Sequence, residues 1–493
     1  MVQDTVSDPE SLAAGLTALD LASNTVHESD LPPEIISDIF ILCLPVHGRV
    51  KPAPGTAPLL LAQICRRWRE IALDTRQIWC SIYLEIPRES SRWDTYSQTA
   101  LRLLQTWIPR AKGYPLSLGL DRDHLLYRPE RRVPRIQYHE KGISTQLLHF
   151  LSTYAMQISR FEARVSDSQF DQIFPPNTWF PLQQSLHIPR CDETRLWNIL
   201  HNSSSLRDLR FYRYMPQYRY SLITITTLDA GNTDFSAGYF FYMLNQFVDL
   251  QRLKCAISNN QRKALIWITP TPHQQLAVLK LNKSNVLAKA VLPNLHDLQI
   301  TDDDSESPFR EILSLVTRSS CALSSLGMCI GDATSSEFYD FLAALPALES
   351  LDIQDCDNID QTLNTILRPL THLRRLTSLS VRAGFLSPSS LDFELLSVLL
   401  RTRDQAAKGA HPIAKLQSLH ITMTFRRRIV DEQWSLDDYR HLITPRESAS
   451  DAEVFKTLVA NSLDLLFTVN STDGEHISWP KPLGMIDPLG DKW

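Results

Sequence analysis

The sequence is poor in glycine and lacks the short motifs that mark most enzyme families. Only 15 glycines occur among 493 residues, and the chain has no P-loop, G-x-G-x-x-G, G-x-S-x-G or H-E-x-x-H pattern. Glycine-rich turns are what allow a backbone to approach a phosphate group closely. None of the 14 histidines has a carboxylate or thiol at a spacing that is typical of a catalytic or metal site. We therefore expect no catalytic centre and no cofactor, and we predict that the protein is not an enzyme.

Paired cysteines, long apolar runs and an excess of positive charge are also absent. The eight cysteines include no C-x-x-C pair and no zinc-ligand spacing, so we expect no metal site, and we expect buried, reduced thiols. No basic segment followed by an apolar run opens the chain, and no apolar run approaches 18 residues. A cytoplasmic or nuclear protein without a membrane span is predicted. The net charge of −5 disfavours nucleic acid as a general partner.

The overall composition of the chain is typical of a folded protein. Hydrophobic residues make up 43% of the chain and charged residues 21%, which are globular values. The length suggests about three ordinary domains, or one small domain followed by a long array. Residues 1–28 contain Asp and Glu but no Lys or Arg, and they are predicted to be a disordered acidic lead-in.

Residues 29–80 contain the most distinctive stretch, LPPEIISDIFILCLP (31–45) followed by APLLLAQICRRWREIALDTRQIW (57–79). Asp30 is placed to cap a helix, and the two prolines at 32 and 33 fit its first turn. Apolar residues at helical spacing predict two or three short helices. The two apolar stripes are Ile35, Ile36, Ile39, Phe40 and Leu42, and then Leu60, Ile64, Trp68, Ile71 and Ala72. Such a small unit has a marginal core and commonly uses part of its surface to bind a partner.

This stretch resembles an F-box, and most of all the F-box-like domains abundant in mushroom-forming fungi. The residues that carry the resemblance are Leu31-Pro32, Glu34-Ile35-Ile36, Ile39-Phe40, Cys65-Arg66-Arg67-Trp68-Arg69 and Trp79. The segment LLQTWIPRAKGYPLSLGLD (103–121) extends the resemblance to about residue 121. In that family the helices dock on the Skp adaptor of a cullin–RING ubiquitin ligase.

The resemblance implies a set of adaptor-binding residues. Those expected to supply an apolar face are Leu31, Pro32, Ile35, Ile36, Ile39, Phe40, Leu44 and Pro45, with Leu60, Ile64 and Trp68 packing behind or beside it. One departure from the family is the connection 47–57, which is longer than in a compact F-box. Its proline and glycine residues predict an exposed loop.

Residues 81–440 are predicted to form an α/β solenoid that is like an irregular array of leucine-rich repeats. Strands are expected at 81–86 and 115–120, with a helix at 96–108 between them. The phrase Leu-x-x-Leu-x-apolar then recurs at 206–211, 276–281, 295–300, 323–328, 348–353, 376–381 and 416–421. Degenerate copies occur at 158–163, 186–188, 225–230 and 250–255. Most intervals are about 19 to 28 residues, which is the range of leucine-rich repeats.

Each phrase is expected to be a parallel strand whose leucines enter a shared core, with a helix or loop on one side. The phrases lack the terminal Asn or Cys of regular repeats, so an irregular array is expected. Residues 441–493 are predicted to be a terminal helix (452–466), which would cover the open end, and a tail.

Within each phrase the third and fifth positions should point away from the core. They form a polar face with charges of both signs, which suits a protein or peptide partner. The predicted target-binding residues, including one tyrosine just after a phrase, are Asp208, Arg210, Tyr212, Lys280, Asp297, Gln299, Asp352 and His420.

The sequence therefore predicts a substrate receptor of a Skp–cullin–F-box ubiquitin ligase, with the F-box on the adaptor and the solenoid on an unknown target protein. Two alternatives stay open. One is a scaffold that acts independently of any ligase. The other is an RNA-binding solenoid, suggested by the basic and aromatic stretch FYRYMPQYRY (211–220).

Overall fold

The structure is a computed structural model of an α/β protein whose chain divides into two compact units, residues 1–185 and 186–493. Each unit is described by itself. The described residues are 31–45, 49–87, 92–121, 143–163, 167–175, 180–188, 193–211, 224–258, 271–301, 308–330, 336–356, 358–367, 373–385, 392–407, 413–425, 457, 459, 463–471 and 476–479. Asp30, Tyr212 and the predicted lead-in 1–28 lie outside these ranges.

The first unit combines short helices with parallel strands. Its helices are α2 (Pro33–Leu42), α3 (Leu61–Ile64), α4 (Arg66–Asp74), η2 (Arg76–Trp79), α5 (Trp93–Trp107), η4 (Ile108–Ala111), α6 (Thr145–Ser152), η6 (Ala155–Gln157) and α7 (Asp167–Ile173). The strands β1 (Ser81–Glu85), β2 (Leu116–Asp121) and β3 (Ile158–Ala163) pair in sequence order. The strands predicted at 81–86 and 115–120 and the helix predicted at 96–108 are confirmed.

The helical segment 31–80 packs against α5 and η4 of the same unit. Trp79 is fully buried, and its ring meets that of Trp107 edge-on at 4.9 Å between centroids. The Arg110 guanidinium lies 4.4 Å from the Trp79 ring centroid, a favourable cation–π distance. The helices that resemble an F-box therefore share one core with α5 and the first strands.

The second unit is an open sheet with helices along it. Its strands are β4 (Ser185–Ile188), β5 (Asp208–Phe211), β6 (Thr227–Phe235), β7 (Arg252–Ile257), β8 (Val278–Leu281), β9 (Asp297–Ile300), β10 (Ser325–Cys329), β11 (Ser350–Cys356), β12 (Ser378–Phe385), β13 (Ser418–Phe425), β14 (Asp464–Ser471) and β15 (His476–Trp479). Its helices are α8 (Glu193–Asn202), α9 (Ala237–Gln246), η8 (Asn285–Ala288), α10 (Phe309–Ser319), α11 (Ser336–Ala343), α12 (Ile359–Leu367) and α13 (Phe393–Ala407). The strands neighbour one another in sequence order.

The leucine phrases coincide with these strands, which confirms that each phrase forms a strand. Each complete phrase begins its strand at the third position. The leucine at the fourth position is in register from strand to strand, through Leu209, Leu228, Leu253, Leu279, Leu298, Leu326, Leu351, Leu379, Leu419 and Leu465. These leucines are almost completely buried, so the fourth position anchors the register of the whole unit.

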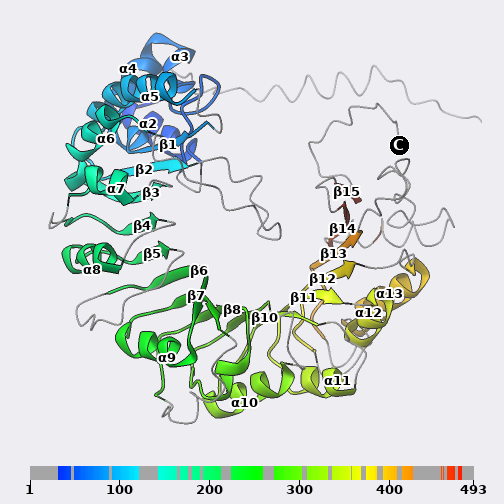
Figure 1. Cartoon of the computed structure of the whole chain (residues 1–493). Coiled ribbons are helices and arrows are strands. Elements are labelled where there is room, and N and C mark those ends of the chain that lie inside the picture. Colours follow the sequence, from blue (N-terminus) through cyan, green and yellow to red (C-terminus); the bar gives the residue numbers. More distant parts are fainter. Residues whose placement is uncertain are drawn as a thin grey trace, which may run out of the picture. The chain divides into compact units, whose positions relative to one another are not determined.

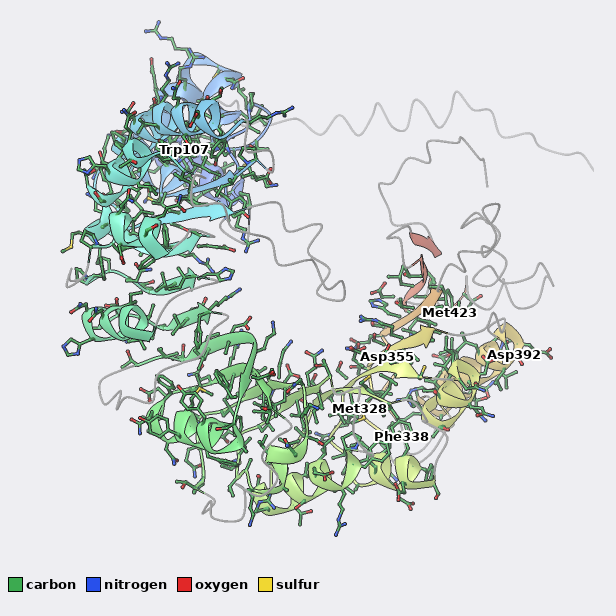
Figure 2. All side chains as sticks on the ribbon, in the orientation of Figure 1. Trp107, Met328, Phe338, Asp355, Asp392 and Met423 are labelled. Atoms are coloured by element: carbon green, nitrogen blue, oxygen red, sulfur yellow. The ribbon has the colours of Figure 1, made fainter. Side chains whose placement is uncertain are left out.

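Helices α9 to α13 lie along one face of this sheet (Figure 1). The core lies between the sheet and these helices, and Figure 2 labels one residue from each side of it, Met328 of β10 and Phe338 of α11. Both side chains are fully buried. We call the opposite face the strand face, defined by the third and fifth positions of each phrase. Their partial exposure in β5, β8, β9 and β11 confirms the predicted alternation there, whereas Gly327, at the fifth position in β10, is buried.

Buried polar side chains satisfy the turn backbone where regular repeats would use a ladder of asparagines. His273 accepts a hydrogen bond from Leu276 N–H at Nδ1, so its Nε2 carries the proton and donates to the Phe247 carbonyl at 2.9 Å. Arg403, which is 2% exposed, donates from Nη2 to the carbonyls of Leu373 and Leu376. The turn carbonyls of Phe247, Leu373 and Leu376 thus each have a hydrogen-bond donor.

The prediction of a terminal helix over 452–466 is wrong at its C-terminal end. Residues 464–471 form β14, which extends the parallel sheet from β13, and β15 returns antiparallel to it. Leu463, Leu465 and Phe467 are buried at alternate positions, which is the strand period. An apolar run of this kind fits both a helix and a strand, and pairing with β13 decides between them.

Candidate functional site

Helix α2 has two apolar faces, and only one of them is available to a partner. Ile36 and Phe40 are 1% and 0% exposed, and the Phe40 ring contacts Trp68 at 5.0 Å between centroids. Ile35 and Ile39 are 46% and 40% exposed. The prediction that all four would supply an adaptor-binding face is therefore wrong for Ile36 and Phe40, because the fold uses them as core.

The predicted second apolar stripe is interrupted at Cys65. This residue is extended (φ −151°, ψ 172°), and its sulfur accepts a hydrogen bond from Trp68 N–H at the start of α4. The break turns Leu60 and Ile64 outward, at 42% and 50% exposure, whereas Trp68 is half-buried. Arg67 Nη2 donates to the Leu31 carbonyl at 2.5 Å, which ties α4 to the start of α2.

We call the exposed apolar residues of this region the helical patch: Ile35, Ile39, Leu42, Leu60 and Ile64. Large apolar side chains left in water in one short segment are typical of an interaction surface. Of the other predicted adaptor-binding residues, Pro32 and Pro45 are exposed and Leu31 and Leu44 are half-buried.

An open, mainly apolar pocket of about 570 Å³ lies at the C-terminal end of α2. Its lining comes from the residues that follow α2, from the connection to α3, and from the first residue of α3: Cys43, Leu44, Pro45, Arg49, Lys51, Gly55, Thr56, Ala57, Leu60 and Leu61. The pocket therefore brings together residues from both halves of the stretch that resembles an F-box.

The connection 47–57 is less exposed than predicted. Val50 is 1% exposed, and its carbonyl accepts a hydrogen bond from Tyr83 N–H in β1 at 2.8 Å. Arg49 lies 5.4 Å from the Tyr83 ring centroid and donates to Glu162 of β3 at 2.6 Å. Lys51 pairs with Glu85. The described part of this connection is thus held against the sheet of the first unit, and it forms one wall of the pocket.

The strand face of the second unit carries the predicted target-binding residues. Arg210, Lys280, Gln299, Asp352 and His420 all occupy fifth positions. They belong to a single register row, which runs through Asp229, Lys254, Gly327 and Ser380 as well. Asp208 and Asp297 occupy third positions in the parallel row. The structure therefore aligns these residues on one face, apart from Tyr212, which lies outside the described residues.

Ion pairs on this face are sparse and local. Arg210 and Asp208 approach to 3.4 Å, and Lys254 and Asp229 to 3.3 Å. His420 Nε2 donates a hydrogen bond to the Asp464 carboxylate at 2.9 Å. Gln354 donates to Asp352 at 2.7 Å. Sequence reasoning did not single out Asp229, Arg252 and Lys254, because their strands contain degenerate copies of the phrase. The alternation around Leu228 and Leu253 was the signal that could have found them.

Thiols and acidic groups show no further cluster. None of the seven described cysteines forms a disulfide, and Cys43 and Cys65 are exposed, which corrects the prediction of buried thiols. Burial raises the pKa of the Cys80 thiol to about 11. Within the described ranges, no group of three or more His, Cys, Asp or Glu residues could hold a metal ion. None of the helices described is long and apolar enough to cross a membrane.

Comparisons with known proteins leave the family of the chain undetermined. No family model matches the sequence, and no curated protein matches it either.

Proposed function

We propose that the protein is a substrate receptor of a Skp–cullin–F-box type ubiquitin ligase. In this proposal the helical patch and the adjoining pocket bind a Skp-type adaptor, and the second unit, a leucine-rich-repeat-like solenoid, binds a target protein with its strand face. The observation that carries the proposal is that the stretch 31–79, whose sequence resembles an F-box, leaves the five large apolar side chains of the helical patch in water. Burying them against a partner would gain roughly 25 cal/mol for each Å² of apolar surface removed from water.

The receptor would contribute no bond chemistry of its own. By binding the adaptor at one end and the target at another, it would raise the effective concentration of target lysines near a ubiquitin-conjugating enzyme. The mixed charges of the strand face favour a polar protein surface as the target, since charge complementarity selects partners more than it adds affinity.

The proposal is tested by capture of the full chain on a purified Skp-type adaptor. The variant Ile35→Asp/Ile39→Asp places two charges in the helical patch without touching the buried Ile36 and Phe40. Interface anchors of this kind each contribute about 1–2 kcal/mol or more, so adaptor affinity should fall by at least about tenfold.

The matched control is Val248→Asp/Val398→Asp, which makes the same change at residues of the second unit that are 64% and 51% exposed. The control should bind the adaptor like the wild-type chain. Equal binding by the patch variant and the wild-type chain would remove the assignment. Capture of a partner protein without any adaptor binding by the wild-type chain would instead favour the ligase-independent scaffold.

A second readout uses the thiol of Cys43, which is exposed and lines the pocket. Alkylation of Cys43 in the free chain should be rapid, and a bound adaptor should protect it. Cys329 of the second unit serves as the internal control, since it lies far along the chain from the helical patch. Unchanged alkylation of Cys43 in the complex would place the adaptor elsewhere.

A further inference from the structure

The strand face carries an unbalanced basic patch on β7 and β8. Lys254 and Lys280 are direct register partners on these adjacent parallel strands (Figure 1). Arg252 lies two residues before Lys254, and so on the same face of β7. Neighbouring strands are about 4.8 Å apart and alternate residues of a strand about 6.6 Å apart. The basic patch (Arg252, Lys254 and Lys280) therefore concentrates three cations in a small area.

This arrangement costs the folded protein free energy, because like charges directly opposite on adjacent strands repel. One carboxylate offsets it in part: Asp229 of β6 lies 3.3 Å from Lys254 Nζ, and it also accepts a hydrogen bond from Gly231 N–H at 2.8 Å. Arg252 and Lys280 are exposed, and their side chains make no ion pair with any residue the structure describes. With Asp229 counted, the three cations leave a net charge of about +2 on β6 to β8, and Asp297 is the carboxylate on the next strand, β9. Arg252 and Lys280 are the two cations still available.

We infer that the basic patch binds an acidic segment of a partner protein, with its carboxylates received by Arg252 and Lys280. The charges complement each other, and an arriving carboxylate would relieve the repulsion between Lys254 and Lys280. This inference rests on the proposed function, since it names the chemistry of the target segment that the strand face would take.

The charges around the patch favour a short acidic segment over a nucleic acid. Asp208 and Asp229 lie on β5 and β6 to one side, and Asp297 lies on β9 to the other side, as the register partner of Val278. A polyphosphate backbone that continued past the patch in either direction would meet these carboxylates. A peptide with a few adjacent carboxylates would contact only the cations.

The experiment measures fluorescence anisotropy of a labelled oligoglutamate peptide with the full chain, at low ionic strength where exposed charge pairs are least screened. Oligoglutamine is the neutral probe. The variant Lys280→Glu replaces an attraction by a repulsion and should weaken oligoglutamate binding by roughly tenfold, as judged from the strength of exposed ion pairs. Arg252→Glu should act in the same direction.

The control variant is Arg310→Glu, which makes the same change of charge at an exposed residue of α10, on the helix side of the sheet. It should bind the peptide like the wild-type chain. Equal affinity for oligoglutamate in Lys280→Glu and Arg310→Glu would overturn the inference, and so would equal binding of oligoglutamine and oligoglutamate. Tighter binding of an oligouridylate that is lost with the same reversals would also overturn it, and would make this a nucleic-acid site.

The adaptor capture separates the two proposals. Lys280→Glu should leave adaptor binding intact. A chain that binds oligoglutamate through the basic patch but fails to bind any adaptor would sustain the inference about ligand chemistry and refute the ligase role. A chain that binds the adaptor but not the peptide would refute the inference about ligand chemistry and sustain the ligase role.

Discussion

Gly119 of β2 provides the sharpest test of the packing in the first unit. Its register partner in β1 is Tyr83, and a Cβ atom added at Gly119 would lie 2.2 Å from Cδ2 and 2.9 Å from Cε2 of that ring. The Tyr83 side chain therefore lies over the glycine. The ring has little freedom to move away, since Tyr83 is 4% exposed and the Arg49 guanidinium lies 5.4 Å from its centroid.

The substitution Gly119→Ala should destabilise the first unit by about 1–2 kcal/mol. Overpacking of this kind costs about 1–3 kcal/mol. Up to about 1 kcal/mol is recovered, because alanine has less backbone freedom to lose on folding than glycine. Urea denaturation followed by circular dichroism gives the free energy of unfolding. Gly55→Ala is the control in the same unit: no atom lies within 4 Å of its added Cβ, so its unfolding free energy should be unchanged or slightly higher.

A double-mutant cycle identifies the cause. Tyr83→Ala alone should cost about 3–5 kcal/mol, as other large aromatic truncations do. In its presence Gly119→Ala should be neutral or stabilising by up to about 1 kcal/mol, because the clash is gone and the smaller backbone entropy loss of alanine remains. The coupling energy should then be about 1–3 kcal/mol, the cost of the overpacking. Additive losses would refute the reasoning, because they would show that the ring does not occupy the space above Gly119.

Three further outcomes are expected. Arg403→Met should lower the free energy of unfolding by about 2–4 kcal/mol, because two turn carbonyls lose charge-assisted hydrogen bonds. The control Arg401→Met, at an exposed residue of the same helix, should be neutral. A stabilised Arg403→Met chain would show that the cost of burying the guanidinium is the larger effect. Burial raises the pKa of the Asp360 carboxyl, so ionisation of this group destabilises the fold as pH rises through that pKa. Asp360→Asn should therefore stabilise the chain at pH 7 but not below pH 3.8, the ordinary pKa of this side chain. Urea midpoints at the two pH values check this. Iodoacetamide at pH 8 should modify the exposed Cys43 well before Cys80, whose pKa is raised to about 11. Mass spectrometry of tryptic peptides gives the order of modification. Faster modification of Cys80 would contradict its burial.

Much of the second unit could be predicted from the sequence, because one local rule is repeated. The leucine at the fourth position of each complete phrase is buried, and the third and fifth positions are partly or fully exposed, apart from the buried Gly327 of β10. A two-residue period of this kind specifies strand, register and face together. The rule failed at residues 452–466, where the same apolar residues also fit a helical period and only pairing with β13 selects the strand.

The helical segment could be located but not oriented from its sequence. Helix α2 is apolar on two neighbouring faces, about 100° apart, so no pattern within it distinguishes Ile35 and Ile39 from Ile36 and Phe40. The choice is made by Trp68, which contacts Phe40 from a different helix. The break at Cys65 was equally hidden, since an extended residue between two short helices leaves the spacing of Leu60, Ile64 and Trp68 helical. Contacts between distant segments decided both questions, and local periodicity cannot report them.

The outermost strands of the two units bear on how the protein behaves in concentrated solution. An exposed strand edge offers unpaired N–H and C=O groups to another molecule, and a long flat edge invites polymerisation. In the first unit the Val50 carbonyl takes the Tyr83 N–H of β1, and in the second β15 lies antiparallel along β14. The chain thus covers part of the β1 edge with its own backbone. In the second unit the sheet ends on the four-residue β15 instead of the eight-residue β14, and a short edge offers a second copy less to pair with. Self-association should therefore rise when β15 is deleted, as light scattering at increasing protein concentration would reveal.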